Sequence, residues 1–563
     1  MKWIYHPMRI IGRSVTAFKR PATIVFAGCV LWLLQGCGSN TEQHKQVFYY
    51  NEVDGVASLD PAFAKNRSVM WVIHQLYNSL VEIDSGLNIV PSLAKSWDIS
   101  ADGMTYTFHL RSNVYFQDDA AFAGGKGRRM TAADVVYSFN RITDKATASS
   151  GAWVFNNRIA PNGFTAVDDT TFKLTLLRPF QPILGILSMQ YCSIVPHEAV
   201  EKYGKDFRRH PCGTGPFSLF IWEEGQALVL HKNEHYWEQD SAGKALPYLD
   251  AVQISFYDNK ATEFLQFRQG VLSFINDVDP SYKDEILTKT GQLRSQWKNR
   301  IVLDTHAYLN TEYFGILTDP DNPLVTQSPL RLKAVRQAMN YAIDRKQLMM
   351  YLRNSIGTPA EGGFVPAGLP SHNAELVKGY PFNPVKAAQL LKEAGFPDGK
   401  GLPVIKLLTI PVYADIASFA ARQMEDVGIK VQVEVVQKSL LLEQTAKSQA
   451  PLFRGSWIAD YPDAENYMAV FYSRNPAPPN YTRYRNPAFD ELYNRALQTT
   501  NDSARYVLYR QMDQLVTDDA PVIPIFYDMA IHLLQPNITG FKANGLNLLE
   551  LRTAAIKNNG MQP

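Results

Sequence analysis

A short apolar run near the start of the chain indicates where the protein is sent and therefore in which environment the rest of the chain folds. Residues 22–34 (ATIVFAGCVLWLL) are apolar and follow a basic segment, residues 1–20. A run of about 13 residues is too short to span a hydrocarbon core of ~30 Å, but it is typical of the apolar region of a signal peptide. No later segment reaches the roughly 18 consecutive apolar residues of a membrane-spanning helix. We therefore expect an exported chain whose remaining residues fold as a soluble body.

The apolar run ends at a cysteine in a characteristic setting. Leu34-Gln35-Gly36-Cys37 resembles a bacterial lipobox, in which a leucine and a small residue precede the cysteine that receives the lipid. We expect a lipoprotein signal peptide over residues 1–36, lipidation of Cys37 and a lipidated tether over residues 37–46. The protein would then be lipid-anchored in the cell envelope, in the periplasm or on the outer face of the cytoplasmic membrane. The alternative is a plain secretory signal with an incidental cysteine.

The charge of the chain changes once this leader is set aside. The full chain has 56 basic and 54 acidic residues. Five of the basic residues precede Cys37, where no acidic residue occurs, so the remainder has 51 basic and 54 acidic residues. Nucleic-acid binding needs a concentration of Lys and Arg. We therefore expect no nucleic-acid partner.

Only two cysteines, Cys192 and Cys212, follow Cys37. An exported chain enters an oxidising compartment, where disulfides form. We predict a Cys192–Cys212 disulfide across a short helix expected over residues 197–203, with two buried free thiols as the alternative. Neither cysteine belongs to a CxxC pair, so we predict no metal site and no cofactor.

The apolar pattern differs between the two halves of the chain. In the first half, alternation over residues 105–111 after the turn at Asp102-Gly103 predicts a β-hairpin, and a second hairpin is expected around residues 167–176. In the second half, a strand, a helix and a strand follow one another over residues 404–435, which predicts a βαβ unit. We predict a mixed α/β fold with a mostly β first lobe, an α/β second lobe and a ligand cleft between them.

The sequence contains little that indicates catalysis. Residues 213–217 (GTGPF) begin like a dinucleotide-binding loop but lack its third glycine, and His231 and His235 do not form an HExxH motif. No G-x-S-x-G elbow occurs. We expect a protein that is not an enzyme, with an exported hydrolase as the alternative from another class.

The most informative residues begin at Arg454. Arg454 and Asp460 share parity along a predicted strand, so both could face one cleft. A free peptide is a zwitterion: an aspartate can bind its ammonium group, and the bidentate fork of an arginine suits its carboxylate. Trp457 and Tyr461 would form the walls of side-chain pockets. From these residues alone, the alternative is a structural salt bridge followed by a turn that Asp463 caps.

Several motifs along the chain occur in the same order as in a known protein family. They are Leu59-Asp60-Pro61, residues 96–116, residues 131–138, residues 213–217, residues 333–338 with 341–345, Ala394-Gly395-Phe396 and residues 457–461. Behind a lipobox, this order resembles the family 5 extracellular solute-binding proteins of ABC importers, specifically the dipeptide- and oligopeptide-binding lipoproteins. The resemblance covers almost the whole mature chain.

The resemblance implies a two-lobed periplasmic-binding-protein type II fold that closes over its ligand. Lobe I would comprise residues 47–81, 206–307 and 522–563, lobe II residues 308–521, and an extra subdomain inserted in lobe I residues 82–205. It also implies a monomeric substrate-binding protein that captures short peptides and delivers them to ABC permease subunits in the inner membrane.

The resemblance also implies which residues contact the ligand. Asp460 matches the acid that binds the peptide ammonium, Arg454 matches the carboxylate-binding arginine of the oligopeptide receptors, and Trp457 falls at a pocket-lining position. The further candidates are Tyr461, Asn66 and Arg67 near a ligand-pairing segment, and Tyr527 after the second hinge crossing. Because the family also includes receptors for nickel chelates, opines and haem, a non-peptide solute on the same fold is the alternative ligand.

Overall fold

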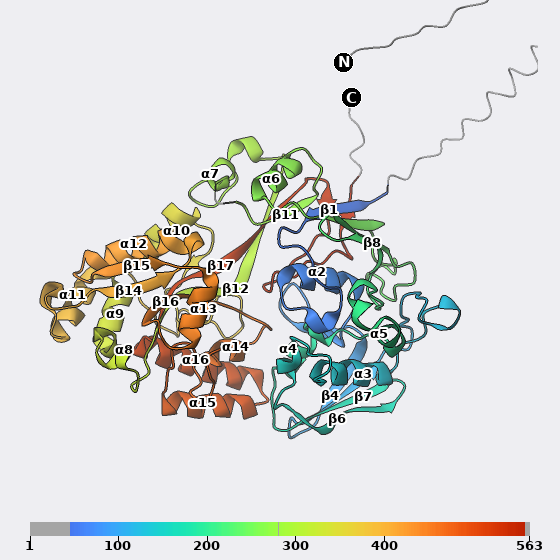
Figure 1. The fold of residues 1–563 in the computed structure, drawn as a ribbon, viewed down its shortest axis with the longest axis horizontal. Coiled ribbons are helices and arrows are strands. Elements are labelled where there is room, and N and C mark those ends of the chain that lie inside the picture. Colours follow the sequence, from blue (N-terminus) through green and yellow to red (C-terminus); the bar gives the residue numbers. More distant parts are fainter. Residues whose placement is uncertain (1–44, 280, 558–563) are drawn as a thin grey trace, which may run out of the picture. The chain divides into compact units, whose positions relative to one another are not determined.

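The structure is a computed structural model that describes residues 45–279 and 281–557. The predicted signal peptide, Cys37 and most of the predicted tether lie outside the described residues. The strands of the described part form three larger sheets and two short two-stranded ones. Together with the helices around them they form the predicted mixed α/β fold (Figure 1).

The first sheet joins the beginning of the described chain to strands that follow far along the sequence. Its order is β1-β10-β9-β8, with β1 and β10 parallel and the other pairs antiparallel. Phe48 and Tyr50 of β1 are fully buried. The strands are β1 (Val47–Asn51), β8 (Phe217–Glu223), β9 (Ala227–Lys232) and β10 (Ala251–Ser255).

The second sheet contains the two predicted hairpins. Its antiparallel order is β4-β5-β7-β6. In β5 the buried side chains of Tyr106, Phe108 and Leu110 alternate with partly exposed ones, because successive side chains of a strand point to opposite faces. The strands are β4 (Ala94–Ile99), β5 (Thr105–Leu110), β6 (Ile159–Asp168) and β7 (Thr171–Leu176), all within the segment predicted as the inserted subdomain.

The third sheet is the largest and contains the predicted βαβ unit. Its order is β11-β17-β12-β16-β14-β15, and β13 also pairs with β17. β14 and β15 are parallel, as predicted, and α12 lies between them in the sequence and packs against both. The strands are β11 (Phe274–Asn276), β12 (Val302–Ile316), β13 (Thr358–Pro359), β14 (Ile405–Thr409), β15 (Val431–Val435), β16 (Leu452–Ile458) and β17 (Val522–Leu534).

The long strands β12 and β17 pair antiparallel along most of their length. β12 crosses the predicted boundary at residues 307/308 between the lobes. The lobe boundaries themselves remain a prediction. The short sheets pair β2 (Val81–Ile83) with β3 (Ile89–Pro91), and β18 (Ile538–Thr539) with β19 (Ala555–Ile556).

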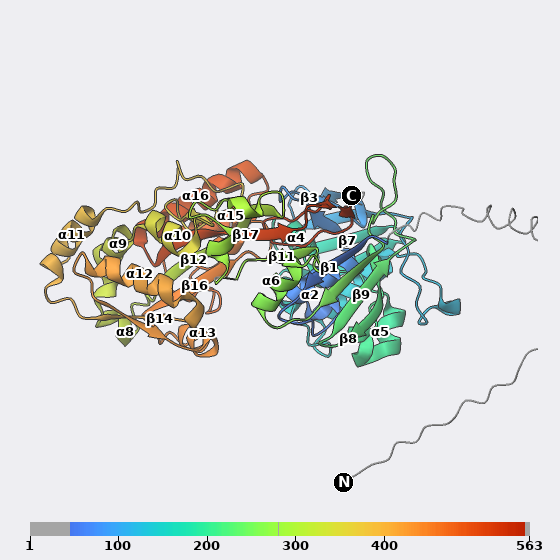
Figure 2. The same cartoon turned by 90° about the horizontal axis from the view of Figure 1, so that it is seen from above.

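Several helices, such as α3, α9 and α12, pack against these sheets. In α12, Ile416, Ala420 and Met424 recur at helical spacing and are buried in one hydrophobic cluster with Leu407 of β14. Figures 1 and 2 show α9 to α12 around this sheet, and Figure 1 shows α3 beside the sheet of β4 to β7, against which it packs.

The bounds of the α-helices are as follows: α2 (Arg67–Leu76), α3 (Ala132–Thr143), α4 (Ile183–Leu187), α5 (His197–Tyr203), α6 (Lys260–Arg268), α7 (Lys283–Ile286), α8 (Pro323–Thr326), α9 (Lys333–Tyr341), α10 (Arg345–Arg353), α11 (Pro384–Glu393), α12 (Ala414–Glu425), α13 (Lys438–Ala446), α14 (Glu465–Met468), α15 (Pro487–Gln498) and α16 (Asp502–Asp519). Helix α5 confirms the helix expected over residues 197–203.

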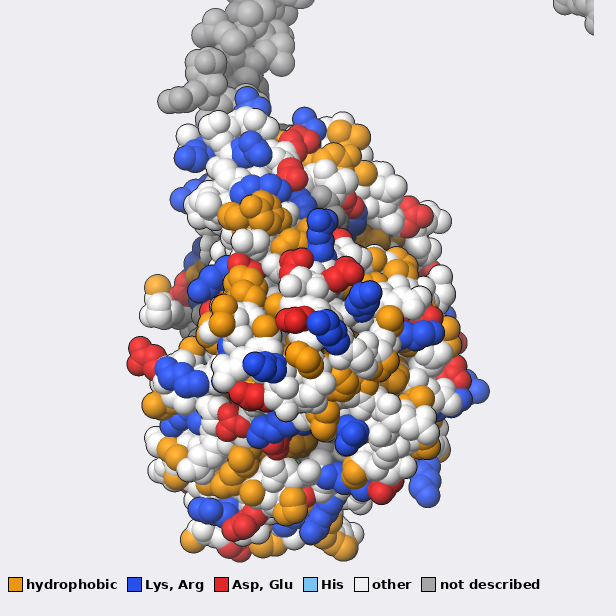
Figure 3. Space-filling view, turned by 90° about the vertical axis from the view of Figure 1, so that its left-hand side faces the viewer, with side chains coloured by type: hydrophobic (Ala, Val, Ile, Leu, Met, Phe, Trp, Pro, Cys, Tyr) orange, Lys and Arg blue, Asp and Glu red, His pale blue; other side chains and the backbone are white. Residues whose placement is uncertain are grey.

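None of the helices in the described part of the chain has both the length and the apolar character that crossing a membrane requires. The face shown in Figure 3 intersperses Lys and Arg with Asp and Glu, and its described residues form no extended field of one sign.

The predicted disulfide is wrong in this structure, where Cys192 and Cys212 are free, buried thiols. Cys192 ends a short helical turn in the main hydrophobic cluster. The thiol of Cys212 donates instead to the backbone carbonyl of Gln117, at 3.5 Å. Both side chains pack as small apolar groups, which free cysteines commonly do. The alternative of two buried thiols therefore holds.

Candidate ligand-binding pocket

The sequence-predicted residues Trp457, Asp460 and Tyr461 line one pocket of about 630 Å³. Its walls combine residues of the loops around β6 and β7, the segment after β16 and helices α14 and α15. The walls combine charged and amide side chains with aromatic rings, which are those of Trp153, Phe180, Tyr191, Trp457, Tyr461, Tyr472 and Tyr493. Small-molecule sites are usually concave and combine apolar and aromatic walls with polar groups that orient the ligand.

Asp460 is held at the pocket by Asn466 of α14. The Asn466 Nδ2 donates to Asp460 Oδ2 at 3.2 Å, and the Asp460 backbone N–H donates back to Asn466 Oδ1 at 3.2 Å. Trp457 Nε1 donates to the same Oδ1 at 3.1 Å. Asn466 therefore orients both predicted contacts.

The Asp460 carboxylate has no cationic partner among the described residues. Its side chain remains accessible to solvent inside the pocket, yet the surrounding protein removes much of its water and raises the pKa of the carboxyl, while the bond from Asn466 lowers it. A partly desolvated, unpaired carboxylate is suited to a cationic group of a ligand, because an ammonium would restore the missing counter-charge.

A second carboxylate in the wall, Glu465, has a different environment. The hydroxyls of Tyr461 and Tyr493 both donate to it. Burial raises the pKa of Glu465, and the two tyrosine hydroxyls oppose this shift. Since both of its oxygens are engaged and the residue is buried, Glu465 positions Tyr461 and Tyr493 in the wall rather than offering a free acceptor.

Three cations also line the pocket: Lys65, Arg158 and Arg178. No ion pair involves any of them within the described part of the chain. Two contacts hold Arg158: its Nη1 donates to the carbonyl of Trp153 at 2.8 Å, and its guanidinium lies 4.9 Å from the ring centre of Phe180. The pocket therefore presents one free carboxylate and three cations without anionic partners.

Arg454, the predicted carboxylate-binding residue, does not line this pocket. Its Nη2 donates to Glu312 Oε2 at 2.6 Å, and its guanidinium lies 3.7 Å from the ring centre of Tyr413. The ion pair is largely buried, with 14% of the Arg454 and 4% of the Glu312 side chain exposed. Strand β16 ends at Ile458, so the parity expected between Arg454 and Asp460 does not extend to Asp460. Here Arg454 forms the structural salt bridge that was the alternative.

Three further residues predicted to contact the ligand, Asn66, Arg67 and Tyr527, do not line the Asp460 pocket. Asn66 caps α2 by accepting from the Val69 N–H at 3.4 Å and lines a neighbouring cavity of about 840 Å³, which shares Lys65 with the Asp460 pocket. Arg67 lies 3.9 Å from Glu52 and above the ring of Trp71. Tyr527 is only 3% exposed and donates to the Gly363 carbonyl at 2.8 Å, so it offers a ligand almost no surface.

No sequence pattern predicted the part of the pocket that follows residue 150. Trp153, Arg158, Arg178 and Tyr191 lie about 300 positions before Asp460, and no local motif marks them. Basic and aromatic residues in the predicted inserted subdomain were the only available signal.

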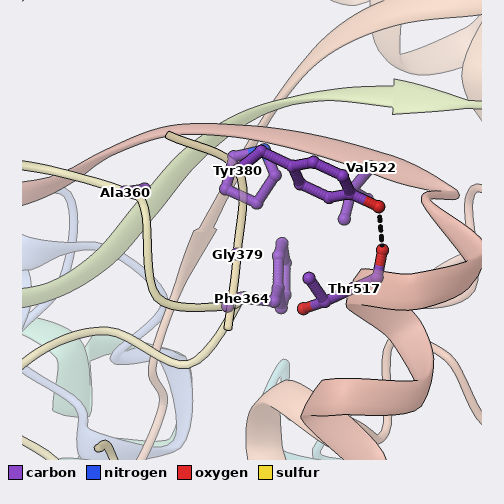
Figure 4. A pocket seen from close by; sticks show the side chains of 8 residues that line it. Ala360, Phe364, Gly379, Tyr380, Thr517 and Val522 are labelled. Atoms are coloured by element: carbon purple, nitrogen blue, oxygen red, sulfur yellow. Dashed lines mark hydrogen bonds between the residues drawn. The ribbon is translucent and has the colours of Figure 1, made fainter. Parts of the chain in front are cut away.

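A smaller cavity near Gly363 does not have room for a ligand. Its volume is about 10 Å³, enough for a single water at most. Figure 4 shows Tyr380 beside it, with the tyrosine hydroxyl donating to the Thr517 carbonyl at 2.6 Å.

The chain is similar to several known proteins. A family described as "Bacterial extracellular solute-binding proteins, family 5 Middle" matches residues 88–478. The chain is 28% identical over 492 residues to the glutathione-binding protein GsiB of Escherichia coli O1:K1, covering 86% of this chain and 89% of that protein. It is 28% identical to heme-binding protein A of Haemophilus influenzae, covering 93% and 96%.

Among solved structures, the chain is similar to the periplasmic binding protein DppA of Helicobacter pylori in complex with the peptide STSA. The TM-score is 0.72 at 26% identity, covering 91% of this chain and 98% of DppA. The predicted fold is thereby confirmed. The proteins that the chain resembles are named as binding proteins, in agreement with the expectation that it is not an enzyme.

Proposed function

Because the chain belongs to the family 5 bacterial extracellular solute-binding proteins, we propose that it is the binding protein of an ABC importer and captures a short peptide in the pocket around Asp460. One observation carries this proposal: the Asp460 carboxylate is unpaired among the described residues and faces an aromatic pocket. A peptide ammonium supplies the charge that this carboxylate lacks.

The charge balance of the pocket narrows the ligand class. One free carboxylate and three cations, Lys65, Arg158 and Arg178, suit a ligand with one ammonium and more than one carboxylate. Glutathione has this charge pattern, and a relative of the chain is named as a glutathione-binding protein. We therefore propose an anionic short peptide, with glutathione as the first ligand to test.

Arg158 is the better candidate for the ligand carboxylate than Arg454. Arg454 already has Glu312 as its partner, and taking it away would leave a largely buried carboxylate unpaired. Arg158 has donors to spare and is already oriented by Trp153 and Phe180. A guanidinium that is fixed in advance loses little freedom on binding a carboxylate.

The Asp460→Asn variant tests the ammonium site. We expect it to weaken binding of glutathione and of tri-alanine by about 3 kcal/mol, somewhat more than a hundred-fold in Kd, because the buried ammonium loses its counter-charge. Calorimetry on the wild type, on this variant and on Asp426→Asn provides the measurement. Asp426 is an exposed aspartate at the end of α12, outside the residues that line the pocket.

N-acetylated forms of both peptides complete this test. They should bind the wild type as weakly as the free peptides bind Asp460→Asn. Equal affinity of wild type and Asp460→Asn for the free peptides would remove Asp460 from this role. Haemin serves as the comparison ligand, since one relative is named as heme-binding. Tight binding of haemin with no binding of either peptide would replace the peptide proposal by the non-peptide alternative.

The Arg158→Gln variant tests the carboxylate site. In the wild type, amidation of the C-terminus of tri-alanine should weaken binding. In Arg158→Gln the acid and the amide should bind alike, because the discriminating guanidinium is absent. Arg454→Gln should still bind the acid more tightly than the amide, and it should lower the stability of the folded protein. Loss of discrimination in Arg454→Gln alone would return the role to Arg454.

The cellular setting is proposed on the sequence alone. Cys37 would carry a lipid that tethers the protein to a membrane in the cell envelope, and the protein would act as a monomer that delivers its peptide to inner-membrane permease subunits. The family is described as extracellular, which supports the export step.

A further inference from the structure

Two histidines and an aspartate meet on the paired strands β12 and β17, away from the peptide pocket. Asp304 and His306 lie two positions apart on β12, so they share one face of the strand. His532 of β17 lies directly opposite Asp304 in the register of the sheet. Asp304 and His532 are 228 positions apart in the sequence, which is why no local motif predicts the cluster.

The spacing of their polar atoms fits a single bound ion. Asp304 Oδ2 lies 3.2 Å from His532 Nδ1 and 3.7 Å from His306 Nδ1. One ligand atom from each residue lies within 4.8 Å of the other two. Metal–ligand distances near 2.0–2.1 Å at a tetrahedral angle separate two ligand atoms by about 3.3 Å. The observed distances are close to this value.

The hydrogen bonds around His532 hold its ring so that Nδ1 faces Asp304. Asn547 Nδ2 donates to Asn276 Oδ1 at 3.1 Å, which directs Asn547 Oδ1 toward His532 Nε2 at 2.9 Å. Nε2 therefore donates to Asn547, and in the neutral ring the Nδ1 lone pair faces the Asp304 carboxylate. Either a proton or a metal cation between Nδ1 and Asp304 Oδ2 removes the repulsion of two acceptors that lie 3.2 Å apart.

This arrangement also matches the surroundings of a metal ligand. A metal-bound histidine usually donates its second ring N–H to a carbonyl or carboxylate, which fixes the ring; here Asn547 does so for His532. Asp304 is 41% exposed, so an ion can enter from solvent on its side.

His306 has an uncommitted ring. Its Nδ1 is 3.7 Å from Asp304 Oδ2, longer than a hydrogen bond. Its Nε2 is buried and has no hydrogen-bond partner among the residues that the structure describes. Neither nitrogen is engaged elsewhere, so either can serve as a ligand.

We propose that Asp304, His306 and His532 bind a divalent transition metal, with Zn²⁺ as the best match. Two imidazoles and one carboxylate are a typical zinc ligand set, and a water completes the tetrahedron. None of the three residues lines the Asp460 pocket. The ion would connect β12 to β17 and so stabilise the pairing of the two longest strands of the large sheet.

Metal titration of the full chain without a histidine tag tests the site. After treatment with a chelator, the wild type is titrated with ZnCl₂ by calorimetry, and bound zinc is counted by elemental mass spectrometry after dialysis. We expect one equivalent of Zn²⁺ and a higher melting temperature. His306→Gln should bind at least tenfold more weakly, while His235→Gln, an exposed histidine outside the cluster, should bind as the wild type does.

Cobalt provides a readout that does not depend on stability. Co²⁺ bound by the wild type should show the visible absorption of tetrahedral coordination, and His306→Gln should lose it. Asp460→Asn should retain zinc binding, so failure of the peptide proposal and failure of this one are distinguishable. No stoichiometric zinc in the wild type, or equal zinc affinity in wild type and His306→Gln, would overturn the site.

Discussion

Two carboxylates five positions apart show how much the neighbourhood of a residue decides its chemistry. Asp460 accepts one bond from an amide and keeps an accessible oxygen. Glu465 accepts from two tyrosine hydroxyls and is buried. Both pKa values are raised by loss of water. Only Asp460 is therefore available to a ligand, although both residues line the same pocket.

The buried carboxyl of Glu52 should make the stability of the protein depend on pH. It is buried, its Oε1 has no hydrogen-bond partner among the described residues, and Arg67 lies 3.9 Å from its Oε2. Burial raises the pKa of Glu52 to about 7 from an ordinary value of 4.5. A raised carboxyl pKa means that the folded state binds the proton more tightly than the unfolded state. Glu52 therefore contributes most stability below pH 4.5, and this contribution is lost as the pH rises through about 7.

The Glu52→Gln variant should remove this part of the pH dependence. One pKa unit corresponds to about 1.4 kcal/mol, so a loss on the order of 2–3 kcal/mol is expected in the wild type. Chemical unfolding at pH 5 and pH 8 measures it. The difference between the two pH values should shrink in Glu52→Gln but not vanish, because burial also raises the pKa of Asp513 to about 7. An undiminished difference in the variant would contradict the assignment to Glu52.

At the scale of elements, the ends of helices and strands decide which side chains reach the pocket. Strand β16 ends at Ile458, and α14 begins at Glu465. The intervening turn places Asp460 against Asn466 instead of continuing the alternation of the strand. Helix α2 similarly begins where Asn66 accepts from the Val69 N–H, between the two cavities that share Lys65.

The Asn66→Ala variant tests whether Asn66 acts mainly as this cap. Loss of an asparagine cap costs about 1 kcal/mol, because a backbone N–H at the helix start loses its acceptor. Chemical unfolding should show this decrease, and Asn66→Ser should restore most of it. Glutathione affinity should stay unchanged in both variants. A large loss of affinity in Asn66→Ala that serine does not rescue would instead support the predicted ligand contact.

At the scale of the whole molecule, residues far apart in the sequence form both the pocket and the core. The main hydrophobic cluster includes Phe48 near the start of the described chain and Leu551 near its end. Cys192 and Cys212 are part of this cluster. Burial raises the pKa of both thiols, which disfavours the reactive thiolate in the native state.

Alkylation therefore should distinguish free thiols from a disulfide. Protein unfolded without reductant and treated with iodoacetamide should carry the label on both Cys192 and Cys212 after digestion and mass spectrometry. The native protein should react slowly at both positions, because both are buried. A sample reduced before alkylation serves as the control and should give the same labelling. Recovery of a disulfide-linked peptide pair would contradict the structure on this point.

Local patterns in the sequence were sufficient to predict the mixed α/β class, the two hairpins and the βαβ unit. Each of these follows from interactions between near neighbours or from a side-chain period that persists over several residues. Alternating apolar residues and an Asp-Gly turn are enough to predict the hairpin of β4 and β5. The apolar faces of β14, α12 and β15 are enough to predict their order.

Tertiary structure alone decided which partner each charged or reactive group received. Glu312 pairs with Arg454, Gln117 accepts from the Cys212 thiol, and Arg158 joins Asp460 in one pocket. The local sequence around these residues does not specify such pairs, because the partners lie about a hundred or more positions away and meet only when separate elements pack. Composition and periodicity thus determined what the chain can build, and long-range packing determined which of its charges remain available to a ligand.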